Sequence, residues 1–287
     1  MKARNFRYIK PASLQHAFRI LEESGGDAIP VAGGQSLMAG LNMRLSAPSL
    51  LVDIGDLQEL GGVSQQNGHV RLGALTRHRE LLGSDTVRRE LPLLAQAATH
   101  IGHVAIRNRG TIGGSLAYAD PAAELPACAV ALGATLVLGS SAGEREVRAE
   151  DFFKGLFETD LRVGELIVAV KFPARAPNMS VGFAELSRRH GDFALVGLAA
   201  VATGRSAIDS ARLVYFGCVD RAKVARSVSA AVAGLRAPVK DNTVIEKAVR
   251  EDLDPDDTPG LRASTKLHLA TVLTRRVLTT LSEGLQP

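Results

Sequence analysis

The chain has 287 residues, of which 46% are hydrophobic and 22% are charged, a balance typical of globular proteins. Its length favours two or three domains, and no run of about 18 apolar residues predicts a membrane span. The net charge of +4 comes from scattered basic residues, so we expect no nucleic-acid-binding surface. The basic N-terminus lacks the apolar segment and cleavage site of a secretory signal, so we expect a cytoplasmic protein.

The first 57 residues alternate between strand-like and helix-like patterns. Ser13 is a candidate N-cap, and apolar residues recur after it at helical spacing, which predicts a helix over 13–24. The run AIPV predicts a strand, AGGQS a loop, LMAGLNMRL a short helix and SLLVDI a second strand. This order predicts a small α/β subdomain over residues 1–57.

Residues 58–176 predict a larger α+β subdomain. We expect a helix capped by Thr76, amphipathic helices over 91–102 and 121–133, and strands in GHVRLGALT, ATLVLGS, REVR and ELIVAVKFP. The proline-rich stretch PARAPNMS then marks a boundary.

Residues 177–287 predict a third domain. Three strand-like runs, VGFAELSRR, FALVGLAAVAT and ARLVYFGCV, are expected to form an antiparallel sheet, and three helical stretches follow over 221–234, 242–252 and 264–284. The short clusters RHRE, IRNR and SRRH are interpreted as solvated surface or partner contacts.

The number and spacing of the cysteine and histidine residues argue against a metal site. Cys128 and Cys218 are the two cysteines, and each lies in an apolar stretch. Two cysteines are fewer than the four thiolates of an ordinary iron–sulfur cluster, and the seven histidines lack zinc-binding spacing. We therefore expect no metal site in this chain.

Two glycine pairs carry the functional signal. Each follows an expected strand or turn and precedes a helix, in AGGQSL (32–37) and TIGGSL (111–116). Glycine lets a ligand approach backbone N–H groups closely, and hydroxyl or amide side chains lie beside both pairs. Neither segment fits the dinucleotide-binding or P-loop patterns. The pairing favours one ligand with a diphosphate.

Three segments carry a family resemblance: VAGGQSLMAGLNMR at 31–44, IRNRGTIGGSLAYADPAAELPA at 106–127 and FAELSRRHGDFALVGLAA at 183–200. They resemble the FAD-binding medium subunit of molybdenum hydroxylases, the carbon monoxide dehydrogenase and xanthine dehydrogenase family. The resemblance implies an α+β fold. It implies a vanillyl-alcohol-oxidase-type FAD-binding domain of two subdomains, followed by a C-terminal domain with a three-stranded antiparallel sheet and helices.

The resemblance also implies which residues contact FAD. Its diphosphate would lie at the two glycine segments, its ribityl or ribose hydroxyls at two carboxylates, and its ring near three apolar residues. At Phe183-Ala184-Glu185, a lysine present in some relatives is absent, and Arg188 or Arg189 could compensate for its charge. The implied cofactor-binding residues are Val31, Ala32, Gly33, Gly34, Gln35, Ser36, Leu37, Ile101, Thr111, Ile112, Gly113, Gly114, Ser115, Asp120, Glu124, Ile167 and Phe193.

The implied function is electron transfer within a larger enzyme. A large molybdopterin subunit would oxidise the substrate, and a small subunit with [2Fe–2S] clusters would deliver electrons to the FAD of this chain, which would pass them to an external acceptor. A dimer of heterotrimers is the implied assembly. Two alternatives stay open: a self-sufficient FAD-dependent oxidoreductase of the same fold, and a scaffold subunit that binds no FAD.

Overall fold

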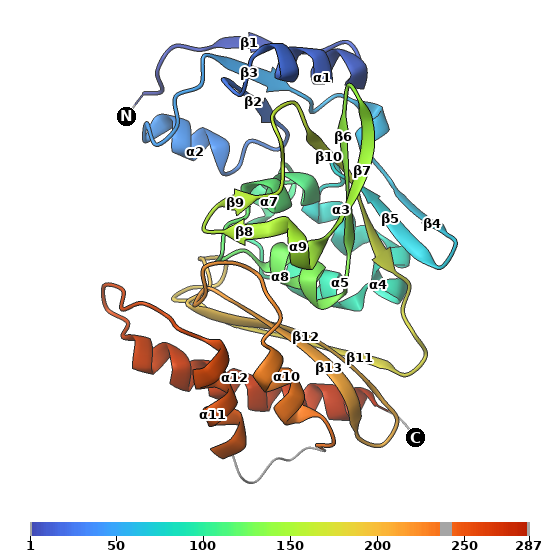
Figure 1. Cartoon of the computed structure of the whole chain (residues 1–287), viewed down its shortest axis with the longest axis vertical. Helices are drawn as coiled ribbons and strands as arrows, with labels where there is room; N and C mark the ends of the chain where they lie inside the picture. Colours follow the sequence, from blue (N-terminus) through green and yellow to red (C-terminus); the bar gives the residue numbers. More distant parts are fainter. Residues whose placement is uncertain (1, 236–242, 286–287) are drawn as a thin grey trace.

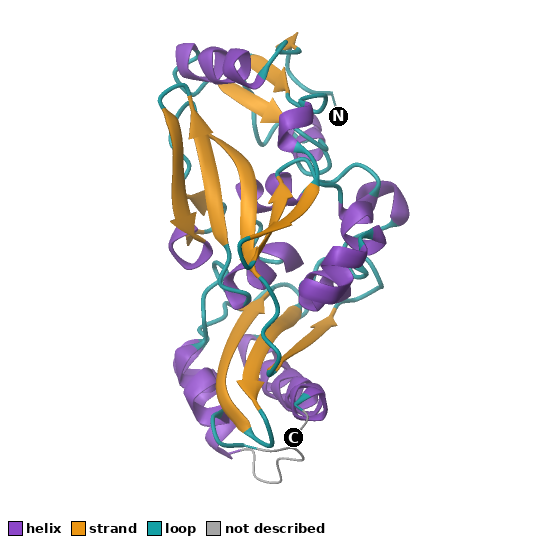
Figure 2. Cartoon of the chain, turned by 90° about the vertical axis from the view of Figure 1, so that its right-hand side faces the viewer, coloured by secondary structure: helices purple, strands orange, loops and turns teal. Residues whose placement is uncertain are grey.

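The computed structural model describes residues 2–235 and 243–285 (Figure 1). Three β-sheets follow one another along the long axis of the molecule, in the order of the sequence, and the side view shows the same succession (Figure 2). None of the helices in the described part of the chain has the length and apolar character needed to cross a membrane.

The N-terminal sheet is parallel, with strand order β1-β3-β2. Its elements are β1 (Arg7–Ile9), α1 (Leu14–Glu23), β2 (Ala28–Val31), α2 (Leu37–Asn42) and β3 (Leu50–Asp53). The Ser13 hydroxyl accepts a hydrogen bond from the backbone N–H of His16, which confirms the predicted cap of α1. Strand β1 was not predicted, because it has three residues and neither an apolar run nor a clear alternation.

The middle sheet is antiparallel, with order β4-β5-β10-β6-β7. Its strands are β4 (Val63–Gln66), β5 (His69–Gly73), β6 (Thr135–Ser140), β7 (Gly143–Arg148) and β10 (Leu166–Pro173), and a small hairpin pairs β8 (Phe153–Gly155) with β9 (Glu158–Thr159). The 3-10 helix η1 (Gln58–Leu60) precedes it. The helices are α3 (His78–Gly83), α4 (Asp85–Glu90), α5 (Pro92–Ala98), α6 (Val104–Arg107), α7 (Ile112–Tyr118), α8 (Glu124–Ala131) and α9 (Ala149–Phe152).

Two hydrophobic clusters connect this sheet to its surroundings. Leu72 of β5 and Phe172 of β10 belong to the core that includes Leu94 of α5. On the N-terminal side, Phe18 of α1 clusters with Val168 of β10, so the first two sheets share apolar packing. Each such side chain that is fully buried stabilises the folded state by about 1.5–3 kcal/mol.

Two local predictions for the middle region were wrong. Thr76 does not cap α3, because its hydroxyl donates to the carbonyl of Gly62 at 3.1 Å and the N-cap position belongs to Arg77. The second glycine pair does not precede its helix, because Gly113 and Gly114 lie in the first turn of α7.

The C-terminal sheet is antiparallel with order β11-β12-β13, as predicted. Its elements are β11 (Met179–Leu186), β12 (Val196–Gly204), β13 (Ile208–Phe216), α10 (Arg226–Val232), α11 (Thr243–Asp252) and α12 (Ala263–Gly284). Asn242, expected to open the second of these helices, lies outside the described residues.

The position of β12 in the fold explains why its sequence is apolar throughout. Leu198 and Ala200 belong to the cluster that contains Val277 of α12, whereas Ala199 and Val201 belong to the cluster that contains the helices of the middle region. Successive side chains of a strand point to opposite faces, so a strand covered on both faces is apolar throughout. The C-terminal sheet therefore packs between α12 and the helices of the middle region.

Candidate functional site

The first glycine segment, residues 32–36, joins β2 to α2. Gly34 has a φ of +71°, a backbone conformation that residues other than glycine rarely adopt. The backbone N–H groups of Gly33, Gly34, Gln35 and Ser36 donate no hydrogen bond to any atom in residues 2–235 or 243–285. The side-chain amide of Gln35 donates to the carbonyl of Gly33 at 2.9 Å and holds the turn closed. Four adjacent N–H donors are thus left for a ligand.

The second glycine segment has a different role from the first. The backbone N–H of Ile112 donates to the Thr76 carbonyl at 3.0 Å, and that of Gly113 donates to the Ala74 carbonyl at 2.8 Å. Thr111 caps the helix by accepting a hydrogen bond from Gly114 N–H at 3.1 Å. These donors are therefore occupied within the protein.

Close packing explains the glycine at position 113. A Cβ added to Gly113 would lie 2.6 Å from the Cβ of Ala74 and 2.8 Å from its carbonyl oxygen. In the described part of the chain, the hydroxyl of Ser115 makes no hydrogen bond and can reach a ligand. The second segment thus offers a ligand a hydroxyl group more readily than backbone donors.

The two glycine segments contact each other. A Cβ on Gly33 would lie 2.3 Å from the carbonyl oxygen of Arg109 and 2.8 Å from the Cα of Gly110, so only glycine fits there. A Cβ on Gly114 would lie 4.0 Å from the Cβ of Ala32. We call residues 32–36 together with 109–115 the glycine cradle.

The glycine cradle fits a diphosphate. Successive free N–H groups form a concave donor surface of the kind that binds anions, and hydroxyl groups at Ser36 and Ser115 add donors at its sides. Ser36 makes no side-chain capping bond to α2, so its hydroxyl is also available. Such a site needs no lysine to bind an anion.

Two acidic candidates follow α7. Asp120 accepts a hydrogen bond from Ala122 N–H at 2.9 Å, and burial raises the pKa of its carboxyl. Burial raises the pKa of Glu124 to about 8, its own backbone N–H opposes this, and the negative charges of Glu185 and Asp120 add to it. A carboxyl with such a pKa keeps its proton at neutral pH and can donate a hydrogen bond to a hydroxyl or carbonyl oxygen.

The three apolar candidates for the ring environment lie in different surroundings. Ile167 is 5% exposed near a bulge in β10, and Ile101 is 8% exposed just after α5. Phe193 is 70% exposed in the loop between β11 and β12. A Cβ added to Gly191 in this loop would lie 3.1 Å from the carbonyl oxygen of Gly102. The loop that carries Phe193 therefore packs against the segment that carries Ile101.

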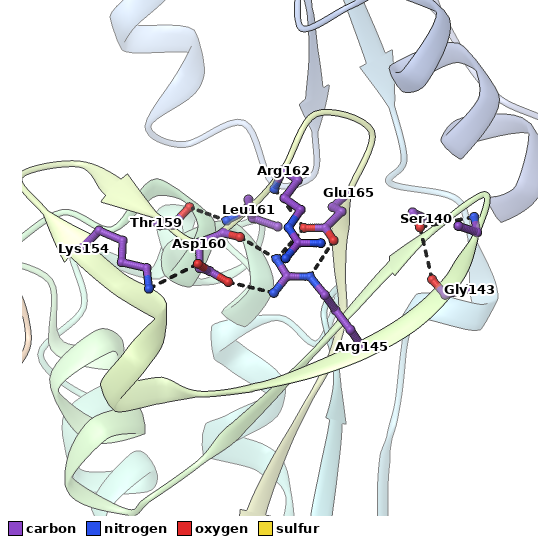
Figure 3. Close-up of polar contacts among 10 residues, drawn as sticks. Ser140, Gly143, Arg145, Lys154, Thr159, Asp160, Leu161, Arg162 and Glu165 are labelled. Carbon is purple, nitrogen blue, oxygen red and sulfur yellow. Dashed lines mark hydrogen bonds and ion pairs between the residues drawn. The ribbon is translucent and has the colours of Figure 1, made fainter.

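An ion network anchors the chain just before Ile167 (Figure 3). Arg145 of β7 donates to Glu165 through Nε at 2.6 Å and through Nη2 at 2.8 Å, and it donates to Asp160 through Nη1 at 2.7 Å. Lys154 lies 3.2 Å from the same Asp160. A bidentate Arg–carboxylate contact fixes geometry as well as adding energy, so this network sets where β10 begins.

Three residues of the site region were missed or misread in the sequence. His78, interpreted as part of a solvated cluster, is 5% exposed and packs against Gly110; burial lowers its pKa. Glu185 is buried with its Oε1 3.9 Å from Nδ1 of His100. Arg188 donates to the carbonyl of Pro259 at 3.3 Å, so its side chain reaches the segment between α11 and α12. Contacts between distant segments define all three positions, and local sequence carries no signal for them.

Comparisons with known proteins cover nearly the whole chain. Residues 4–175 match the FAD binding domain in molybdopterin dehydrogenase, and residues 182–281 match the CO dehydrogenase flavoprotein C-terminal domain. The chain is 45% identical to the 6-hydroxypseudooxynicotine dehydrogenase complex subunit alpha of Paenarthrobacter nicotinovorans over 71% of this chain and 69% of the relative. It is 37% identical to the caffeine dehydrogenase subunit beta of Pseudomonas sp. (strain CBB1) over 97% and 95%.

Solved structures give the same result. Carbon monoxide dehydrogenase from Hydrogenophaga pseudoflava matches with a TM-score of 0.93 at 32% identity, covering 98% of both chains. Quinoline 2-oxidoreductase from Pseudomonas putida 86 matches with a TM-score of 0.92 at 38% identity over the full length of both. FAD is the cofactor of the family whose model matches residues 4–175, and its diphosphate is the kind of ligand that the glycine cradle fits. The chain belongs to the FAD-binding medium subunits of the molybdenum hydroxylases, the family of carbon monoxide dehydrogenase and xanthine dehydrogenase.

Proposed function

We propose that this chain is the electron-transfer subunit of a molybdenum hydroxylase. It takes electrons from iron–sulfur clusters of a partner subunit and passes them to an external acceptor. The observation that carries the proposal is the glycine cradle, in which two segments about 80 residues apart in sequence meet and leave adjacent N–H groups free. When bound, FAD supplies the redox chemistry, and the protein positions and tunes it.

Different residues of this chain hold different parts of FAD. Gly33 to Ser36 bind the diphosphate through backbone N–H groups, and Ser115 adds its hydroxyl. Asp120 and Glu124 bind sugar or ribityl hydroxyls, and the ring lies toward Ile101, Ile167 and Phe193. Thr111, Ile112, Gly113 and Gly114 shape the cradle, with Val31, Ala32 and Leu37 at its edge. The FAD-binding subdomains end at residues 57 and 176.

Partners complete the enzyme. Two cysteines cannot bind an ordinary iron–sulfur cluster, so the clusters belong to another chain. The relatives support this, because their names describe a subunit alpha, a subunit beta and a medium chain. A large molybdopterin subunit and a small [2Fe–2S] subunit, arranged as a dimer of heterotrimers in the cytoplasm, are the assembly we propose.

The test uses the complex purified with its partners and, separately, the chain alone. We expect the chain alone to bind FAD and to oxidise no organic substrate. In the complex, dithionite should reduce the clusters and then bleach the flavin absorption band. Oxidation of a substrate by the chain alone would instead support a self-sufficient oxidoreductase. A chain without flavin absorption, in a complex from which no FAD can be extracted, would support a scaffold that binds no FAD.

A matched variant separates electron transfer from assembly. A complex carrying Gly33→Ala should keep its iron and molybdenum but lose FAD, because the added methyl group enters the Arg109 backbone. We then expect cluster reduction without transfer to an external acceptor. Transfer at the wild-type rate in a flavin-free complex would contradict the proposal.

A further inference from the structure

A buried carboxyl lies where the middle region meets the C-terminal sheet. Glu185 projects from β11, its side chain is 2% exposed, and its Oε2 makes no hydrogen bond within the described residues. Leaving a buried polar atom without a partner costs about 1–3 kcal/mol. An atom of this kind beside a cofactor site points to a ligand that supplies the missing partner.

Burial disfavours the charged form of Glu185. His100, beyond the end of α5, is the one base within 4 Å among the described residues, and burial together with the charge of His190 lowers the pKa of His100. Glu124 at the start of α8 interacts electrostatically with Glu185, and Asp120 beyond α7 adds negative charge near Glu124. Burial raises the pKa of Glu185 to about 7. Its carboxyl is therefore mostly protonated below pH 7 and is a hydrogen-bond donor there.

The surroundings of Glu185 include segments already assigned to the flavin. Glu124 is a candidate cofactor contact, and His100 directly precedes Ile101. The ring of His100 lies 5.0 Å from that of Phe183 on the same strand as Glu185. The loop after β11, which carries Phe193, packs on the backbone of Gly102 through Gly191. These contacts bring the expected ring environment and Glu185 to one place.

We propose that Glu185 is a binding residue for the flavin ring, which donates a hydrogen bond from its protonated Oε2 to a carbonyl oxygen or ring nitrogen of the flavin. The inference rests on the proposed placement of FAD and adds to it a residue that binds only in one protonation state. Nδ1 of His100 lies 3.9 Å from the other carboxyl oxygen, Oε1, so the imidazole lies beside the carboxyl group. Ionisation of Glu185 removes the donor and places a negative charge against the acceptor, so FAD binds more weakly.

The test measures the Kd for FAD against pH, by quenching of FAD fluorescence on titration with the apo full-length chain. Binding that requires the protonated carboxyl should weaken about tenfold per pH unit once the pH exceeds about 7. Glu185→Gln keeps an N–H donor and cannot ionise, so its Kd should stay nearly constant up to about pH 8, where Glu124 begins to titrate. Glu185→Leu has no donor, so it should bind weakly throughout. Glu144→Gln, the same change at an exposed position of β7, should behave as the wild type.

Each outcome decides one question. The same pH profile in Glu185→Gln as in the wild type would overturn the proposal, because another group would then titrate. Tight binding by Glu185→Leu at acidic pH would also overturn it. Thermal melting of each apo-protein checks that the variants fold. If Glu185→Leu does not fold, the comparison of the wild type with Glu185→Gln still tests the proposal. Failure of the wild type to bind FAD at any pH would instead contradict the proposed placement of FAD.

Discussion

Gly33→Ala tests the contact between the two glycine segments. The new Cβ would lie 2.3 Å from the Arg109 carbonyl oxygen, so the segments must separate by roughly 1 Å to reach an ordinary contact distance. A shift of that size lengthens hydrogen bonds from the first segment to a diphosphate beyond useful range. Each lost charge-assisted hydrogen bond costs about 1.5–3 kcal/mol, so we expect the Kd for FAD to rise about 10- to 100-fold for each one lost.

Gly40→Ala is the matched control. Gly40 lies in α2, a few residues along the chain, and a Cβ there meets no atom within 4 Å. Alanine is favoured over glycine in a helix by about 1 kcal/mol, so this variant should melt at or above the wild-type temperature and bind FAD normally. The assay is FAD titration by fluorescence quenching, with melting of the apo-protein measured by circular dichroism.

Two results would contradict the expected role of Gly33. Suppose that the Kd of Gly33→Ala for FAD were within about twofold of the wild-type value and that its melting temperature were unchanged. The two segments would then not need their close contact to bind the cofactor. If Gly40→Ala lost FAD equally, the effect would come from the region as a whole.

Three further predictions concern the surroundings of the site. Gly113→Val should lower the free energy of unfolding of the apo-protein by about 1–3 kcal/mol in urea titrations, because its side chain enters the Ala74 backbone; wild-type stability would refute this. Arg145→Met should cost about 1–3 kcal/mol and free the start of β10, measured by urea unfolding and hydrogen exchange; unchanged exchange there would contradict the anchoring role. The pKa of Glu185 is about 7 in the folded chain and near 4.5 when unfolded, so its titration should lower apo-protein stability by about 2–3 kcal/mol between those pH values. The raised pKa of Glu124 adds to this fall, so Glu185→Gln should make the fall shallower without removing it, and an unchanged fall would contradict the protonated state of Glu185.

Periodicity and motif predicted most of the fold but only part of the site. The spacing of Leu14, Ala17, Phe18 and Leu21 correctly placed α1, because a helix with one buried face repeats its apolar residues locally. The apolar run over residues 193–203 correctly predicted β12. By contrast, β1 is too short to leave a pattern in its own sequence.

The site depends on contacts that local sequence does not encode. The glycine pair at 113–114 was expected to offer free N–H groups, but the Gly113 donor goes to Ala74, 39 residues away along the chain. Likewise, the environment of Glu185 arises because β11 packs beside the end of α5, where His100 lies. A motif identifies which residues meet a ligand region, whereas the fold decides which of their atoms remain available.

The central claim is that the free N–H groups of the first glycine segment bind the diphosphate of FAD. A crystal structure of the FAD-loaded protein tests it most directly. We predict diphosphate oxygens within about 3 Å of the backbone nitrogens of Gly34, Gln35 and Ser36, with the Ser115 hydroxyl nearby. A diphosphate bound elsewhere, with those nitrogens facing solvent, would contradict the claim.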